Sequence, residues 1–321
     1  MPVSMSVPVP VPMPNPMTAD EFRHAVAAGG CTDLSGRTKL QLRGADRVRY
    51  LNGQVTNDVA QIAAGETIYA CVTDRKGRLE ADAYITAGPG DSLLLDAPGE
   101  LRESLLARLD RYIIADDVEL ADVTDDWKLI HCLGPASAGD GGPESLRRAC
   151  NRFGVPGADL WFPAGAAPAS GAPALSPDVL ERLRIENRIP AWGAELGPGV
   201  LPPEARLETR AISFEKGCYI GQEVISRIRS VGRVNRTLER VVQAGAGAAP
   251  LESGCALTSG SGEPAGMLTS VCPGPEPGKR IGLAYVKRGF SAPGTLLDVR
   301  DPENKLVSRV EIRDAADLSH S

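Results

Sequence analysis

The stretch Lys216-Gly217-Cys218-Tyr219-Ile220-Gly221-Gln222-Glu223, followed by Arg227, is the most informative part of this 321-residue chain. Its glycines let the backbone come close to a ligand or a partner. The residues from Gln222 to Arg229 carry apolar side chains at helical spacing, so we predict a helix that begins just after the cysteine. A neighbouring lysine and a helix N-terminus both favour the thiolate form of a cysteine. The pattern therefore predicts a reactive Cys218 that is activated by Lys216, and a buried, inert thiol is the alternative.

Composition excludes several classes of protein. The net charge of −6 argues against general nucleic-acid binding, and direct DNA binding is not expected. No stretch is apolar enough to span a membrane. The seven cysteines are an odd number without C-x-x-C spacing, which argues against a disulfide framework and against a metal site. We therefore expect a protein of the reducing cytoplasm, with His131 buried in the core.

The pattern of apolar residues changes twice along the chain. Residues 1–17 are rich in proline and read as a disordered tail. Residues 18–236 alternate between short strands and helices, with a hairpin at 67–85 and helices at 100–114, 143–153 and 177–189. Residues 237–313 hold six short β-like runs separated by Gly, Pro and Ser, which predicts a small barrel, and 314–321 form a second tail. The expected fold class is α+β followed by a β-barrel.

The cysteine motif, residues 216–223, resembles the signature of the YgfZ family, folate-binding relatives of the T-protein (aminomethyltransferase) of glycine cleavage. Four further blocks share this resemblance: 44–46 with 50–59, 184–186, 189–193 and 201–204. The similarity runs from about Leu34 to about Arg313. It implies a T-protein-like fold, in which two α+β subdomains and a C-terminal barrel surround a central cavity that binds folate.

The resemblance also implies a set of cofactor contacts for tetrahydrofolate or a derivative. Glu186 matches a glutamate that binds the pterin in the T-protein branch, although it could instead pair with Arg184 or Arg188 on a helix surface. Asp82 matches the second of two adjacent aspartates in T-proteins, and Ala81 replaces the first. The further expected contacts are Trp192, Tyr219, Gln222 and Arg227.

Three functions remain open at this point. By resemblance, the protein supports the assembly or repair of certain iron–sulfur enzymes, including those that thiolate tRNA, and Cys218 performs a thiol or one-carbon step. Its partners would be folate and iron–sulfur enzymes or assembly proteins. The first alternative is an aminomethyltransferase, against which Ala81 argues. The second is a non-catalytic folate-sensing scaffold that docks a partner through a basic surface between Arg227 and Arg240.

Overall fold

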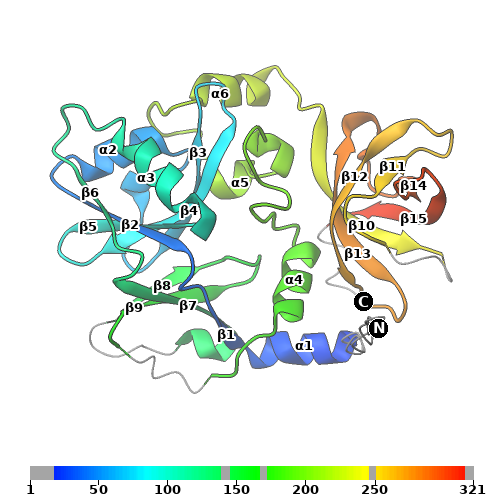
Figure 1. The fold of residues 1–321 in the computed structure, drawn as a ribbon, viewed down its shortest axis with the longest axis horizontal. Helices are drawn as coiled ribbons and strands as arrows, with labels where there is room; N and C mark the ends of the chain where they lie inside the picture. The colour runs from blue at the N-terminus through cyan, green and yellow to red at the C-terminus, as the bar shows by residue number, and fades with distance from the viewer. Residues whose placement is uncertain (1–17, 139–144, 167–171, 246–250, 315–321) are drawn as a thin grey trace, which may run out of the picture.

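Two antiparallel sheets and a closed barrel make up the protein (Figure 1). The computed structural model describes residues 18–138, 145–166, 172–245 and 251–314. The helices α4 (Pro177–Glu186), α5 (Glu208–Ala211) and α6 (Gln222–Ser230) lie between the sheets and the barrel (Figure 1). This is the T-protein-like arrangement that the sequence predicts.

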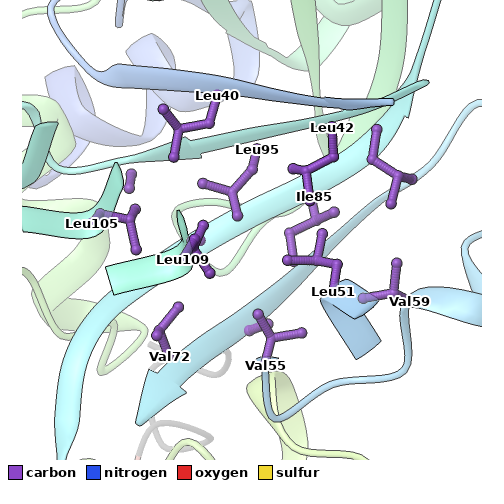
Figure 2. Packing of buried hydrophobic residues seen from close by; sticks show 14 of the residues in the cluster. Leu40, Leu42, Leu51, Val55, Val59, Val72, Ile85, Leu95, Leu105 and Leu109 are labelled. Carbon is purple, nitrogen blue, oxygen red and sulfur yellow. The ribbon is translucent and has the colours of Figure 1, made fainter. Parts of the chain in front are cut away.

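The first sheet carries the best-packed core. Its strands follow the order β3 (Thr67–Thr73), β4 (Leu79–Gly88), β5 (Ser92–Ala97), β2 (Thr38–Arg43) and β6 (Glu119–Asp122). Side chains alternate between the two faces of each strand. On one face, Leu40, Leu95 and Ile85 pack against α2 (Arg47–Gln54) and α3 (Arg102–Asp110) (Figure 2). Each fully buried leucine stabilises the fold by about 1.5–3 kcal/mol, so this core fixes the position of the opposite face.

The second sheet follows the order β1 (Gly30–Asp33), β7 (Trp127–Leu133), β9 (Gly157–Pro163) and β8 (Leu146–Cys150). Helix α1 (Ala19–Ala28) precedes it and begins at Thr18, whose side chain forms a capping box with Glu21. Cys31 and Cys132 lie directly opposite each other on β1 and β7 and form a disulfide. The sequence argued against a disulfide framework and did not predict this bond, because 101 residues of sequence separate two neighbours in the sheet.

One expected helix is also wrong. Within 143–153, residues Leu146–Cys150 form strand β8, which pairs with β9, and part of the expected helix lies outside the described residues. Sheet pairing satisfies the backbone hydrogen bonds of this segment and overrides its weak helical preference. The helix expected at 177–189 is confirmed as α4, which has Pro177 at its first position, is capped by Ser176 and ends at Glu186.

The barrel closes in the order β10-β13-β12-β11-β14-β15. Its strands are β10 (Arg236–Ala244), β11 (Ala256–Thr258), β12 (Pro264–Pro273), β13 (Arg280–Lys287), β14 (Leu296–Arg300) and β15 (Leu306–Arg313). Each of the six β-like runs of the sequence falls in one of these strands. Short 3-10 helices occur at Val59–Gln61, Gly99–Leu101, Gly134–Ala138, Pro202–Ala205 and Arg288–Phe290. In the described ranges, no helix has both the length and the apolar character needed to cross a membrane.

Buried polar contacts attach α4 to the barrel. Arg184 donates hydrogen bonds to Glu195 at 3.0 Å and to the Ser270 hydroxyl of β12 at 2.6 Å. The Tyr285 hydroxyl of β13 donates to the backbone oxygen of Glu195 at 2.9 Å. These bonds hold the segment after α4 against both the barrel and the cavity described next.

Candidate functional site

A cavity of about 370 Å³ lies beside the first sheet, and it is called here the Asp82 cavity. Tyr69 of β3 and Tyr84 of β4 line it, and their ring centroids are 4.6 Å apart. Phe153 and Trp192 line it as well. Small-molecule sites are commonly apolar cavities with a few fixed polar groups, and the aromatic lining gives this one faces on which a flat ring can stack.

Asp82 places a carboxylate inside this cavity. Its side chain is buried, and the Tyr69 hydroxyl donates a hydrogen bond to Oδ2 at 3.0 Å. The other oxygen, Oδ1, is buried and has no hydrogen-bond partner among the described residues. Burial raises the pKa of Asp82, and the nearby Arg37 partly opposes this shift. Buried polar atoms are nearly always hydrogen-bonded, so this oxygen is an open acceptor inside the cavity.

Three arginines line the cavity, Arg37, Arg152 and Arg184, and two of them share one buried carboxylate. Arg37 and Arg152 both line it, and both pair with the fully buried Asp96. Arg152 also donates to Asp159 at 2.8 Å and lies 4.0 Å from the centroid of the Tyr84 ring. Burial alone would raise the pKa of Asp159, but Arg152 lowers it well below its usual range. The two guanidinium groups are therefore fixed in place by buried carboxylates.

His131 belongs to this buried network and not to a catalytic pair. It is fully buried, and its Nδ1 lies 2.8 Å from Oδ1 of Asp159. Burial lowers the pKa of His131, although Asp159 opposes the shift. The expectation that His131 is a core residue is confirmed.

Ala81, which the resemblance matches to the first T-protein aspartate, faces away from the cavity. It is fully buried in the core cluster under α2 and α3, whereas Asp82 is on the opposite face of β4. Ala81 therefore belongs to the core and not to the lining of the Asp82 cavity.

The structure brings only some of the expected cofactor contacts together. Trp192 and Asp82 line the same cavity, but Glu186 does not. Glu186 instead lines a separate cavity of about 340 Å³ between α1, α4 and the barrel. Its carboxylate pairs with Arg182 at 2.9 Å, so it joins a helix-side ion pair, although with neither Arg184 nor Arg188.

The cysteine motif docks on the first subdomain. Lys216 is buried, and its Nζ donates to the backbone oxygens of Asn52, Val55 and Asn57 at 2.6, 2.8 and 2.6 Å. These bonds use all three donors of an ammonium group, so none is left for the Cys218 thiol. Burial lowers the pKa of Lys216 to about 8, against a smaller opposing effect of Asp58.

The rest of the motif contains both closely packed and exposed residues. Cys218 is exposed, whereas Tyr219 is buried beside the Lys216 ammonium, which lies 5.3 Å from its ring centroid. Gly221 has a φ of 89°, and a Cβ there would lie 2.6 Å from the backbone oxygen of Asp74 in the β3–β4 turn. The motif is thus held by close backbone packing, and its thiol faces outward.

The predicted helix after the motif is confirmed as α6, with Gln222 half-buried at its start and Arg227 exposed. Not all of the arginines expected to form a basic surface between Arg227 and Arg240 are exposed. Arg240 is 2% exposed and donates to the backbone oxygen of Asp314, so it belongs to the interior.

Sequence reasoning missed Tyr69, Tyr84, Arg37 and Arg152 as cavity residues. The two tyrosines are direct partners in the β3–β4 pairing, so counting outward from the hairpin turn could have placed them together. No local signal identifies the arginines, because their carboxylate partners come from β5 and β9.

Comparison with known proteins agrees with the fold. Residues 7–139 match the GCVT N-terminal domain, and residues 236–312 match the glycine cleavage T-protein C-terminal barrel domain. A crystal structure of glycine cleavage system aminomethyltransferase T from Bartonella henselae superimposes with a TM-score of 0.79 at 18% identity, over 92% of this chain and 88% of that one. The chain has the T-protein fold.

Curated relatives of this T-protein-fold chain extend over most of its length. It is 28% identical to an aminomethyltransferase of Rubrobacter xylanophilus, covering 80% of this chain and 76% of that protein. It is 29% identical to a putative chloroplastic transferase of Arabidopsis thaliana (87% and 70% covered). It is 26% identical to a mitochondrial aminomethyltransferase of Gallus gallus (83% and 76% covered). The chain is thus a homologue of aminomethyltransferases.

Proposed function

We propose that this protein binds tetrahydrofolate in the Asp82 cavity and acts as a folate-dependent one-carbon transferase of the aminomethyltransferase type. The observation that carries the proposal is the half-paired, buried carboxylate of Asp82 in an aromatic cavity of a T-protein fold. The similarity to aminomethyltransferases supports the same reaction class.

The residues of the cavity fit a pterin. The pterin ring is flat and carries N–H donors, and Oδ1 of Asp82 is an open acceptor for one of them. Tyr84 and Trp192 offer apolar ring faces, and Arg37 and Arg152 hold fixed positive charge at the wall. Tetrahydrofolate, when bound, supplies the nitrogen that takes up the one-carbon unit.

Asp82 is the proposed acid–base residue. Because burial raises the pKa of Asp82, its carboxyl group gains and loses a proton nearer to neutral pH than an exposed aspartate does. The Tyr69 hydroxyl keeps Oδ2 occupied, so proton exchange takes place at Oδ1. Ala81 lies on the other face of the strand and does not weaken this role.

Calorimetric titration with tetrahydrofolate tests the binding step. We expect one saturable site whose affinity falls about 10- to 150-fold in Asp82→Asn, the size of one hydrogen bond to a charged group. Asp110→Asn is the matched control, since Asp110 is exposed on α3. Turnover with an aminomethylated lipoyl carrier should be lost in Asp82→Asn only. Absence of binding at millimolar folate, or equal affinities for the two variants, would overturn the proposal.

A second function is proposed from Cys218. It is exposed, while the other free cysteines, Cys71, Cys150, Cys255 and Cys272, are buried. Its neighbours Lys216 and Tyr219 anchor the loop on either side, so the thiol is presented at a fixed place. With the YgfZ-like motif, this favours a thiol step in support of iron–sulfur enzymes, including those that thiolate tRNA.

Thiol titration and complementation in cells test the second function. With a disulfide-exchange reagent, wild type should show one fast thiol that Cys218→Ser removes and Cys255→Ala retains. Cells that lack the protein should recover iron–sulfur enzyme activity with wild type and not with Cys218→Ser. Full recovery with Cys218→Ser rules out the thiol step. Folate binding without turnover in that case would favour the scaffold.

A further inference from the structure

A third cavity, of about 680 Å³, lies between α6, the Pro202–Ala205 segment and the barrel. It shares no lining residue with the Asp82 cavity. Thr237 of β10 and Arg288, just after β13, contribute from the barrel side. Interfaces between structural units are a preferred place for small-molecule sites, and this volume lies in their usual range.

The floor of this cavity is apolar. Ile225, which is fully buried, and Ile228 come from one side of α6. Phe214 and Val234 extend the apolar surface on either side of that helix. An apolar ligand body placed here would be removed from water, which is favourable in proportion to the area buried.

The rim of the cavity carries unpaired positive charge. Arg229 stacks on Phe214 at 3.9 Å from the ring centroid. Arg233 and Arg288 are exposed, and neither forms an ion pair with any residue in the described ranges. The neighbouring Arg236, by contrast, pairs with Glu204 at 3.1 Å. Arg233 and Arg288 thus line the cavity without a carboxylate partner among the described residues.

One carboxylate, Glu208, also lines the cavity, and burial raises its pKa; it stands against the three guanidinium groups of Arg229, Arg233 and Arg288. Guanidinium groups bind carboxylate, phosphate and sulfonate groups through several parallel hydrogen bonds. The cavity therefore combines an apolar floor with an excess of cationic donors at its edge.

We propose that this cavity is a second binding site, separate from the folate site, for a small amphipathic anion. The apolar body of the ligand lies on Ile225, Ile228 and Phe214, and its anionic head lies between Arg233 and Arg288. Affinity comes mainly from the apolar floor, and the arginines select for negative charge, because single exposed ion pairs contribute little.

Paired fluorescent probes test this site in the full-length protein. The anionic probe is 8-anilinonaphthalene-1-sulfonate, and the neutral probe is N-phenyl-1-naphthylamine, which has the same apolar body without the sulfonate. We expect one saturable site for the anionic probe, weakened about tenfold in Arg233→Gln/Arg288→Gln, while binding of the neutral probe changes less than about twofold.

The matched control is Arg75→Gln/Lys76→Gln, which removes two exposed charges from the turn between β3 and β4. This control should leave binding of the anionic probe unchanged. If the double arginine variant melts below wild type, the single variant Arg288→Gln replaces it. Saturating tetrahydrofolate should not displace the anionic probe.

The outcomes separate cleanly. Non-saturable binding, equal weakening by both double variants, or equal loss of both probes would overturn the anion site. Displacement by tetrahydrofolate would also overturn it, because the cavity would then be a continuation of the folate site. Since the probes need no turnover, failure of the transferase proposal leaves this test intact.

Discussion

Lys216→Met separates a structural role of this lysine from a catalytic one. Methionine keeps an unbranched apolar stem of similar length and removes the ammonium group. In wild type, that group donates to three backbone oxygens at 2.6–2.8 Å, those of Asn52, Val55 and Asn57. The substitution therefore leaves three acceptors without their donor at the junction between the cysteine motif and the first subdomain.

The magnitude follows from these contacts. A buried acceptor that loses its donor costs about 1–3 kcal/mol. Val55 is fully buried, whereas Asn52 and Asn57 are half-buried and accessible to water, so the low end of the range applies to them. We expect a loss of about 3 kcal/mol of stability, which lowers the melting temperature by roughly 5–10 °C.

Differential scanning fluorimetry and urea unfolding measure this effect. The matched control is Lys76→Met on the exposed β3–β4 turn, which should melt within about 1 °C of wild type because surface substitutions change stability little. A Lys216→Met protein that melts like the control, while its Cys218 thiol reacts far more slowly, would refute the reasoning. Lys216 would then activate the thiol, as the motif alone predicts.

Three further predictions concern stability. Burial raises the pKa of Asp82, so the folded protein binds the Asp82 proton more tightly than the unfolded protein does; the stability from this proton is full at low pH and is lost as pH rises through the folded-state pKa. Asp82→Asn should therefore melt above wild type at pH 7 but not at pH 3, which melting curves across pH check. Gly221→Ala should cost about 3 kcal/mol in urea unfolding, because its φ is positive and its Cβ meets backbone, whereas Gly217→Ala, where a Cβ meets nothing within 4 Å, should unfold like wild type. Cys31→Ser/Cys132→Ser should lower the free energy of unfolding by up to about 4–5 kcal/mol, because the disulfide closes a long loop in the unfolded chain. If chemical reduction of the wild-type protein does not change its melting temperature, this prediction is contradicted.

Local patterns predicted the elements whose signals are local. The six barrel strands and α4, with Pro177 at its first position, follow from turn residues and local spacing. Residues 146–150 were misjudged, because an edge strand depends on its partner more than on its own residues. The resemblance named Asp82 as a cofactor contact, and the structure places Asp82 in a cavity lining. It also named Glu186, which lines another cavity, since helix spacing alone does not say which neighbour a side chain meets.

The buried charges beside the Asp82 cavity constrain how this protein can evolve. Asp96 comes from the first sheet and Asp159 from the second, and Arg152 joins them, so the ligand-facing guanidinium is also a tie between the two sheets. Loss of one partner from such a cluster leaves an unpaired charge in the interior, which lowers the stability of the fold by about 3–5 kcal/mol. A change of ligand preference through Arg152 therefore requires simultaneous replacement of its carboxylates. Single-step adaptation is left to positions such as Trp192, which line the cavity without joining that cluster.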